Sequence, residues 1–369
     1  MDADTPGPPP PLRVGIIGTG GVAHLHAAAL RARGDARMVA AIDTDAARAR
    51  EFAAQYGIPR SGTSFADLPE VDVLHLCTPP GVHAEQAEAA FALGAHVVVE
   101  KPPALSLAEV DRMLAAAEAA DRRLAVVFQQ RTGTAAAHVR RLLRSGVLGR
   151  ALVARCDTLW YRDDEYFAAP WRGRWETEGG GTTFGHGIHQ LDLLLHLLGD
   201  VDEVTGQAWR LGREIETEDV STAVLRFASG AVASVLTSAV SPRQSSSIRI
   251  DTERATIELE HLYGHSHAHW RITPAPHVEP DEAAQWVLPD EEVASGHEPY
   301  LDAVYTALRT GRPLPDVADE PTRSLELVTA LYLSTLRAGP FRLEELRSDP
   351  SLRAAVRAEV VDLRQEGRR

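Results

Sequence analysis

The first third of the chain alternates short, continuously apolar runs with amphipathic helical patterns. The run at 96–100, for example, has three consecutive valines, so it lacks the polar alternation of a strand that faces water on one side. Strands of this kind belong to parallel sheets that helices cover on both faces. We expect such a domain here, with strands at 13–18, 38–43, 73–77, 96–100 and 124–128 and helices at 22–33, 81–93 and 106–120, plus one that ends at 56.

After about residue 149 the sequence pattern changes, and it indicates longer strands with partial alternation of apolar and polar residues. Ser229-Gly230 is a hairpin signal between two of them, which favours an antiparallel sheet. We expect strands at 152–160, 201–209, 222–227, 231–239, 247–251 and 256–260, and helices at 181–198, 298–310 and 321–336. The chain then divides into a disordered tail (1–11), a parallel α/β domain (12–131), an α+β domain with an open, mostly antiparallel sheet (132–340) and a helical tail (341–369).

A glycine-rich segment lies between the first strand and the first helix. Residues 18–23 read Gly-Thr-Gly-Gly-Val-Ala, which fits the pattern Gly-x-Gly-x-x-Gly/Ala. The first glycine permits a tight turn, the second lets a pyrophosphate approach the backbone, and the small last residue lets helix and strand pack closely. An acid, Asp43, ends the second strand, where a carboxylate can bind ribose hydroxyls. The pattern predicts a Rossmann domain that binds a dinucleotide through Gly18, Thr19, Gly20, Gly21, Val22 and Asp43.

Two questions about this segment stay open. The segment could be a plain turn, with Asp43 capping the next helix. If it binds a dinucleotide, Asp43 would repel a 2′-phosphate, and Thr44 and Asp45 supply no cation for one. NAD is therefore favoured over NADP, although Arg48 leaves NADP open.

The chain contains 37 arginines but one lysine, Lys101, and no asparagine. This skew is typical of a GC-rich genome, in which surface lysines are replaced by arginine at little cost. A lysine that survives is a functional candidate because ammonium and guanidinium differ in size, pKa and donor geometry. Lys101 ends the fourth strand, and ligands of such sheets bind beyond the carboxyl ends of the strands. There it could stabilise alkoxide charge, and burial would lower its pKa towards the acid/base range.

The overall charge and the cysteines exclude several classes of partner. A net charge of −14 argues against nucleic-acid and anionic-membrane partners, which require a basic patch. No apolar run reaches the roughly 18 residues of a membrane span. Cys77 and Cys156 lie far apart in the sequence, which is no disulfide framework and favours the reducing cytoplasm. The acidic, proline-rich start has no signal-peptide pattern.

Four motifs together resemble the Gfo/Idh/MocA oxidoreductases, from about residue 12 to 340. They are Gly18-Thr19-Gly20, Cys77-Thr78-Pro79-Pro80 with His83, Glu100-Lys101-Pro102, and Gly179-Gly180-Gly181 leading into Gly187-Ile188-His189-Gln190-Leu191-Asp192. The resemblance implies a Rossmann domain, a second domain whose open sheet often serves oligomerisation, and NAD or NADP as cofactor. The implied substrates are sugars, sugar derivatives and cyclitols, and we expect a homo-oligomer, either a dimer or a tetramer.

The resemblance also implies roles for individual residues. Lys101 would bind the reacting hydroxyl and His189 would act as general base, since imidazole titrates near neutral pH. Further cofactor contacts are expected at Cys77, Thr78, Pro79, His83, Glu100, Lys101 and Gln129, and Gln129 is expected to contact substrate too. Arg131 falls in the same region and could be structural.

The chain departs from the family at Gly185. The family usually carries an Asp there, four residues before the His, so that both side chains share one helix face. Without this Asp, a His–Asp relay is in doubt, and the chain looks like members that act on sugar derivatives with Lys and His alone. Neighbouring His186 could line the substrate pocket or simply pack. Asp192 could orient His189, but a structural hydrogen bond between the domains is favoured.

Two further segments allow more than one interpretation. Trp171 and Arg172, just before the proposed catalytic helix, suit a sugar-binding pocket, because tryptophan faces pack on sugar rings and arginine binds hydroxyls or carboxylates. A subunit interface would explain the tryptophans equally well. A second segment contains four histidines but no cysteine or carboxylate that completes a metal site, so we expect a polar hairpin and no metal. These histidines are His261, His265, His267 and His269.

The leading hypothesis is an NAD(P)-dependent dehydrogenase that transfers hydride between nicotinamide and a secondary hydroxyl of a sugar-like substrate. A glycosidase or lyase that uses transient oxidation by tightly held NAD is the second hypothesis. A non-catalytic dinucleotide-binding regulator is the third, although such a protein needs neither Lys101 nor His189.

Overall fold

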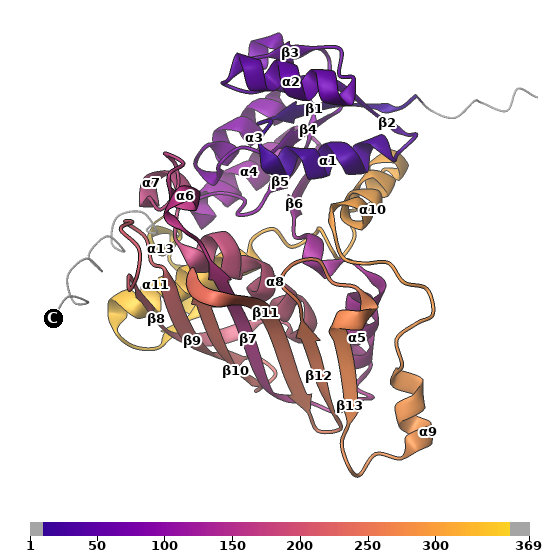
Figure 1. Cartoon of the computed structure of the whole chain (residues 1–369), viewed down its shortest axis with the longest axis vertical. Helices are drawn as coiled ribbons and strands as arrows, with labels where there is room; N and C mark the ends of the chain where they lie inside the picture. Colours follow the sequence, from indigo (N-terminus) through magenta and orange to yellow (C-terminus); the bar gives the residue numbers. More distant parts are fainter. Residues whose placement is uncertain (1–9, 355–369) are drawn as a thin grey trace, which may run out of the picture.

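The computed structural model describes residues 10–354 and divides into two lobes (Figure 1). The first lobe is built on a six-stranded, all-parallel sheet with the order β3-β2-β1-β4-β5-β6. Its strands are β1 (Leu12–Ile17), β2 (Ala36–Ile42), β3 (Ser61–Gly62), β4 (Val73–Leu76), β5 (His96–Glu100) and β6 (Leu124–Val127). The predicted parallel Rossmann sheet is therefore confirmed, and β3 is the short strand that the sequence pattern missed.

Helices cover both faces of this sheet. They are α1 (Gly21–Arg31), α2 (Ala46–Tyr56), α3 (His83–Ala92) and α4 (Leu107–Ala119). Alternate residues of the central strands enter two separate cores: Val98 packs with α1 and α2 residues, whereas Val97 and Val99 pack with α3 and α4 residues. This two-sided burial is why the strands are apolar throughout.

The second lobe is built on an eight-stranded sheet with the order β13-β12-β11-β7-β10-β9-β8-β14. Only β7 and β10 pair in parallel, and all other neighbours are antiparallel, as predicted for a mostly antiparallel sheet. The strands are β7 (Ala151–Tyr161), β8 (Val201–Trp209), β9 (Val220–Phe227), β10 (Val232–Ser238), β11 (Val240–Thr252), β12 (Ala255–Glu260), β13 (Trp270–Pro274) and β14 (Phe341–Arg342).

Helices pack on one face of this sheet and leave the other face open. The packed helices include α5 (Thr134–Ser145), α8 (Ile188–Leu198) and α11 (Arg323–Arg337). Valines on three adjacent strands of the open face are largely exposed, at 55% for Val153, 52% for Val224 and 41% for Val232. Short helices complete the described chain: α6 (Asp164–Phe167), α7 (Trp175–Glu178), α9 (Pro280–Ala283), α12 (Leu343–Ser348) and α13 (Pro350–Ala354).

The predicted single helix over 181–198 is wrong at its start. A π-helical turn spans Thr183–Gly187, and regular α-helix begins at Ile188. Glycines allow this wider turn to lie close to the sheet: a Cβ at Gly181 would lie 1.8 Å from the carbonyl oxygen of Glu218, and one at Gly187 would lie 2.6 Å from Thr237 Cγ2. The turn therefore changes which side chains of this segment face the same side.

Helix α10 (His297–Thr310) returns to the first lobe, although it lies within the range 132–340 that we expected to form the second domain. It packs against α1, and its Tyr300, Val304 and Tyr305 belong to the same core as Val14 and Val98 of the Rossmann sheet (Figure 1). The domain boundaries remain a prediction in which α10 has to be assigned separately. Residues 1–9 of the expected tail and 355–369 of the expected helical tail lie outside the described residues. Within the part that is described, no helix is long and apolar enough to cross a membrane.

Candidate active site

The glycine-rich turn after β1 has the geometry of a phosphate cradle. Gly18 adopts φ +83°, and a Cβ there would lie 2.8 Å from the carbonyl oxygen of Cys77. A Cβ on Gly20 or Gly21 would meet nothing within 4 Å, so the backbone is open to a ligand at these two positions. No side chain of the described residues caps α1 at Gly20, which leaves the N-terminal N–H groups of the helix for an anion. The residues present therefore fit a dinucleotide pyrophosphate.

Asp43 lies next to this turn. Its Oδ2 accepts hydrogen bonds from Thr19 N (2.8 Å) and Thr19 Oγ1 (3.0 Å), and its Oδ1 accepts from Asp45 N (2.9 Å) and Arg48 Nη2 (2.9 Å). Burial opposes ionisation, but these donors keep the pKa of Asp43 below its ordinary value. Asp45, and not Asp43, caps α2 by accepting from Ala47 N and Arg48 N, so the alternative in which Asp43 is the cap is wrong.

The loops after β4 and β5 are tied together by His83. Its Nδ1 lies 3.0 Å from the carbonyl oxygen of Pro102, and its Nε2 lies 2.7 Å from that of Thr78. Thr78 Oγ1 donates to Gln86 Oε1 (2.7 Å), and burial raises the pKa of the Cys77 thiol well above its ordinary value. The structure thus places His83 and Cys77 behind the cradle as buried residues, while their predicted cofactor contacts remain predictions.

Lys101 extends from the end of β5 towards the second lobe. Its Nζ donates to the carbonyl oxygen of Gly185 at 3.3 Å, so it reaches the position at which the family's Asp is absent. Burial lowers the pKa of Lys101, and nearby Arg172 and Arg162 act in the same direction, whereas the carboxylates of Glu100 and Glu178 oppose the shift. The ammonium is therefore held where its proton is easier to release than in water.

Glu100 anchors a buried hydrogen-bonded cluster behind Lys101. Its Oε1 lies 2.9 Å from His26 Nε2 and 3.0 Å from His297 Nε2, and its Oε2 accepts from Lys101 N at 3.2 Å. The cluster continues inward, because His26 Nδ1 lies 2.7 Å from His75 Nδ1. His75 Nε2 in turn lies 2.8 Å from the hydroxyl of Tyr305. These contacts hold Glu100 as an anion, with a pKa well below its ordinary value even though burial opposes ionisation.

The two histidines of the proposed catalytic segment share one environment. The ring centroids of His186 and His189 lie 4.9 Å and 6.4 Å from that of Trp160, so both rings face the same side of this segment. Burial, with Lys101 among the further causes, lowers the pKa of both well below the ordinary value. Within the described chain His189 has no hydrogen-bond partner, whereas His186 Nε2 contacts Arg162 Nε (3.2 Å) and the Tyr166 hydroxyl (2.9 Å). His189 is thus a neutral imidazole that is free to accept a proton.

The predicted segment at Trp171 and Arg172 joins this group through Arg172. The Arg172 guanidinium stacks on the rings of Tyr166 (3.8 Å) and Trp171 (4.1 Å), and its Nη1 donates to Glu178 Oε1 at 3.1 Å. Glu178 Oε2 also accepts from Gly173 N (2.6 Å), and burial raises its pKa. A Cβ at Gly185 would meet Glu178 Oε1 at 3.5 Å, so a carboxylate from α7 occupies the space beside the missing Asp.

Gln129 lies at the opposite edge of the site. Its Nε2 donates to the hydroxyl of Tyr263, and its Oε1 is buried without a partner among the described residues. The Tyr263 ring lies 5.4 Å from that of His189, almost perpendicular to it. Arg131 next to Gln129 is turned away: it forms a buried bidentate pair with Asp192 at 2.8 and 2.6 Å. The interpretation of Arg131 and Asp192 as structural residues is therefore supported.

Several residues of the site were missed by sequence reasoning. His26, His297, Tyr263, Arg162, Tyr166 and Glu178 carry no motif of their own. Tyr263 lies among the four histidines of the predicted polar hairpin. That segment does connect the antiparallel strands β12 and β13, but His267–His269 form a short 3₁₀ turn and no strand face. His261 and His269 stack at 3.8 Å, and His265 is buried with both ring nitrogens unpartnered among the described atoms.

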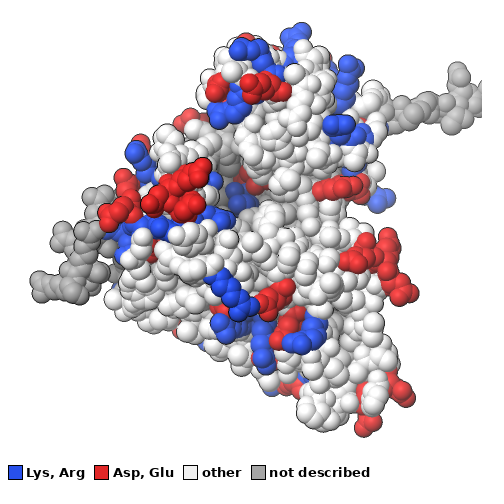
Figure 2. Space-filling model, viewed as in Figure 1, with Lys and Arg blue, Asp and Glu red and all other residues white. Residues whose placement is uncertain are grey.

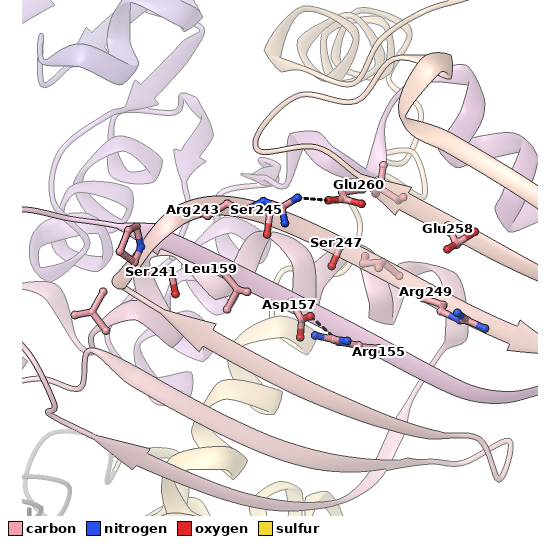
Figure 3. Close-up of a pocket in the computed structure, with 14 residues that line it drawn as sticks. Arg155, Asp157, Leu159, Ser241, Arg243, Ser245, Ser247, Arg249, Glu258 and Glu260 are labelled. Carbon is pink, nitrogen blue, oxygen red and sulfur yellow. Dashed lines mark ion pairs between the residues drawn. The ribbon is translucent and has the colours of Figure 1, made fainter.

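A hollow with a volume of about 640 Å³ lies on the open face of the large sheet, away from the site described above (Figure 3). Three of the arginines that line it have carboxylate partners: Arg155 with Asp157 (2.6 Å), Arg243 with Glu260 (3.8 Å) and Arg249 with Asp251 (2.9 Å). None of the predicted site residues lines it. Lys101 of the first lobe instead contacts Gly185 of the second, and the surface between the two lobes is hollowed in Figure 2.

Comparison with known proteins agrees with both lobes. Residues 12–128 match the model of the oxidoreductase family with an NAD-binding Rossmann fold, and residues 136–258 match that of the GFO/IDH/MocA C-terminal domain. Among solved structures, the WlbA dehydrogenase from Bordetella pertussis, in complex with NADH and UDP-GlcNAcA, is 31% identical with a TM-score of 0.81. This match covers 91% of this chain and 99% of that one.

Two curated dehydrogenases illustrate the range of relatives. D-glucoside 3-dehydrogenase of Escherichia coli is 32% identical over 51% of this chain and 54% of the relative. Myo-inositol 2-dehydrogenase of Thermotoga maritima is 31% identical over 60% and 66%, respectively. The chain thus spans between half and two thirds of the length of these two relatives. Taken with the fold and the two matching domain models, these likenesses show that the chain belongs to the Gfo/Idh/MocA family of oxidoreductases.

Proposed function

We propose that the chain is an NAD-dependent dehydrogenase that acts on a secondary hydroxyl of a sugar, sugar derivative or cyclitol. The observation that carries the proposal is the contact of a partly buried lysine at the end of a Rossmann strand with the segment that carries His189, in a lobe whose glycine cradle fits a dinucleotide. His189 is buried and has no hydrogen-bond partner within the described chain. The named relatives support the same class, since two are dehydrogenases of a glucoside and of an inositol and the third is a dehydrogenase in complex with NADH and UDP-GlcNAcA.

In the proposed mechanism the protein handles the proton of the hydroxyl group. NAD, when bound, supplies the hydride acceptor. His189 accepts the hydroxyl proton, because burial and the Lys101 charge keep its ring neutral. Lys101 donates a hydrogen bond to the same oxygen and stabilises the developing alkoxide. Glu100, fixed by two histidines, keeps the backbone of Lys101 in place.

Substitution of the two catalytic residues tests the proposal. Lys101→Ala and His189→Ala should each lower NAD reduction, followed at 340 nm with a panel of sugars and cyclitols, by about 10²- to 10⁴-fold. Lys101→Arg is the matched variant, since it keeps the charge but not the compact ammonium, and it should also lose most of the activity. Turnover within a few-fold of wild type in both alanine variants would sink the mechanism.

We propose NAD as the preferred cofactor because Asp43 lies beside the turn and repels a 2′-phosphate. Arg48, the nearby cation, already pairs with Asp43 at 2.9 Å. The ratio of kcat/KM for NAD to that for NADP should therefore exceed one in the wild type. Asp43→Ser should lower this ratio by roughly 10-fold or more, in line with the loss of hydrogen bonds to a charged group. A wild-type enzyme that prefers NADP would contradict the role of Asp43.

We further propose a homo-oligomer, a dimer or a tetramer, that associates through the open sheet face. The exposed valines Val153, Val224 and Val232 lie on the neighbouring strands β7, β9 and β10 and form an apolar strip. Val224→Arg should lower the mass measured by light scattering after size exclusion, and an unchanged mass would exclude this face. The two buried free thiols, Cys77 and Cys156, support a reducing compartment such as the cytoplasm.

A further inference from the structure

Arg162, directly after β7, is an arginine of the site without a carboxylate partner. Its Nε donates to His186 Nε2 (3.2 Å), and its Nη1 donates to the carbonyl oxygen of Tyr161 (3.0 Å). The guanidinium lies over the rings of Trp160 (4.6 Å) and Tyr166 (5.0 Å). Between residues 10 and 354 no carboxylate oxygen comes within ion-pair distance of it, although it is partly buried. No ion pair within these residues therefore neutralises its positive charge.

The groups around Arg162 add to this positive charge. The charges of Lys101 and Arg172, like that of Arg162, lower the pKa of His186, so positive charge gathers near this histidine. Glu178 compensates for one of them through its contact with Arg172 at 3.1 Å. Asp163 follows Arg162 in the chain, but its exposed carboxylate caps α6 by accepting from Tyr166 N at 2.9 Å. The carboxylate of Glu100 is engaged by His26 and His297 on the far side of Lys101.

This excess of charge is costly in the free protein. Burial, with Arg172 among the further causes, lowers the pKa of Arg162, and burial also lowers that of Lys101. An anion that entered between these side chains would reverse both effects. Nε and Nη1 of Arg162 are engaged by His186, Tyr161 and Gln244, but no hydrogen bond from its Nη2 is found among the described residues. Nη2 can therefore donate to an oxygen of a carboxylate or phosphate, and the positive charge strengthens that hydrogen bond.

We propose that the substrate carries an anionic group, a carboxylate or a phosphate, and that Arg162 binds it while Lys101 and His189 act on the hydroxyl. This inference rests on the proposed dehydrogenase function and narrows its substrate class to acidic sugars. Arg162 thereby determines specificity, with Tyr166 and Trp160 orienting its guanidinium.

The experiment compares three probes of related shape: D-glucuronate, D-glucose 1-phosphate and D-glucose. Binding to the NADH-loaded protein is followed by tryptophan fluorescence, since Trp160 lies beneath Arg162. NAD reduction is measured in parallel with the same three compounds. We expect at least one anionic probe to bind about 10- to 100-fold more tightly than D-glucose, the difference that a hydrogen-bonded charge supplies. The glucuronate and phosphate arms then show which of the two anions the site takes.

Substitutions test whether Arg162 causes the preference for an anionic probe over D-glucose. Arg162→Gln should abolish it by weakening the anionic probe about 10- to 100-fold while D-glucose binding stays the same, and Arg162→Lys should retain part of it. Arg155→Gln is the matched control, because Arg155 lies on β7, the strand that Arg162 directly follows, but faces the open side and pairs with Asp157. Unfolding temperature and NADH affinity show whether the Arg162→Gln variant folds.

The outcomes separate this inference from the proposed function. Equal binding of all three probes by the wild type, or an equal loss for charged and neutral probes in Arg162→Gln, overturns the inference even if sugars are oxidised. An Arg162-dependent anion preference together with no NAD reduction by any sugar, acidic or neutral, supports the anion site and instead counts against the dehydrogenase function.

Discussion

Replacing Arg131 should lower the free energy of unfolding more than replacing any exposed arginine. The guanidinium joins the end of the Rossmann lobe to α8, and the side chains of Arg131 and Asp192 are only 2% and 1% exposed. Arg131→Met leaves the Asp192 carboxylate buried with Ser324 as its remaining side-chain donor among the described residues. Breaking a buried pair in this way costs about 3–5 kcal/mol. We therefore expect the free energy of unfolding to fall by about that amount in urea titrations followed by circular dichroism, with an unchanged dependence on urea.

Two further variants make this prediction falsifiable. In Arg131→Met/Asp192→Leu the stranded charge is gone as well, so the double variant should be more stable than Arg131→Met alone. Arg271→Met is the control: Arg271 is 71% exposed and pairs with Glu258 on the open face, so its loss should cost less than about 1 kcal/mol. If Arg131→Met costs no more than Arg271→Met, the Arg131–Asp192 pair does not join the lobes as argued.

Three other changes test the electrostatics of the site and of the fold. Glu178→Gln removes a carboxylate that raises the pKa of Lys101, so the basic limb of the kcat/KM profile should move to lower pH; an unmoved limb would mean that the two groups are not coupled. Gly185→Asp sets a second carboxylate beside Glu178 and should lower activity at least 10-fold, and Glu178→Gln in the same chain should restore much of it. Burial lowers the pKa of His265 to about 3. Below pH 6.5 this histidine is therefore protonated in the unfolded chain but stays neutral in the folded chain. Stability should therefore fall with acidification between pH 6.5 and 3 by about 1.4 kcal/mol per pH unit for this group, and His265→Phe should flatten the curve in urea titrations repeated at each pH.

The Rossmann lobe could be predicted closely from sequence because its signals are local. Apolar runs define the strands, and the turn at Gly18 is recognisable because φ +83° and the contact with Cys77 admit no side chain. Lys101 stood out since it is the one lysine among 37 arginines. Both features depend on neighbouring residues or on composition, which a single chain displays directly.

The rest of the site depends on contacts between distant segments. Tyr263 reaches Gln129 from a loop 134 residues away, and His297 reaches Glu100 across 197 residues. Gly185, which lies beside Glu178, is part of a π-helical turn, and helical periodicity does not predict such a turn. These placements follow from tertiary packing, so no local sequence pattern predicts them.

Because α10 packs on the first lobe, part of the core of that lobe is synthesised long after its strands. Ribosomes release the Rossmann strands through β6 about 170 residues before α10 begins, an interval of roughly 10–30 s at ordinary rates of synthesis. During that interval the α1 side of the nascent sheet lacks Tyr300 and Tyr305, and Glu100 has His26 but not yet His297. The core of the nucleotide-binding lobe is therefore completed only when α10, in the last quarter of the protein, has been made, and a chain that stops after β6 is an incomplete domain.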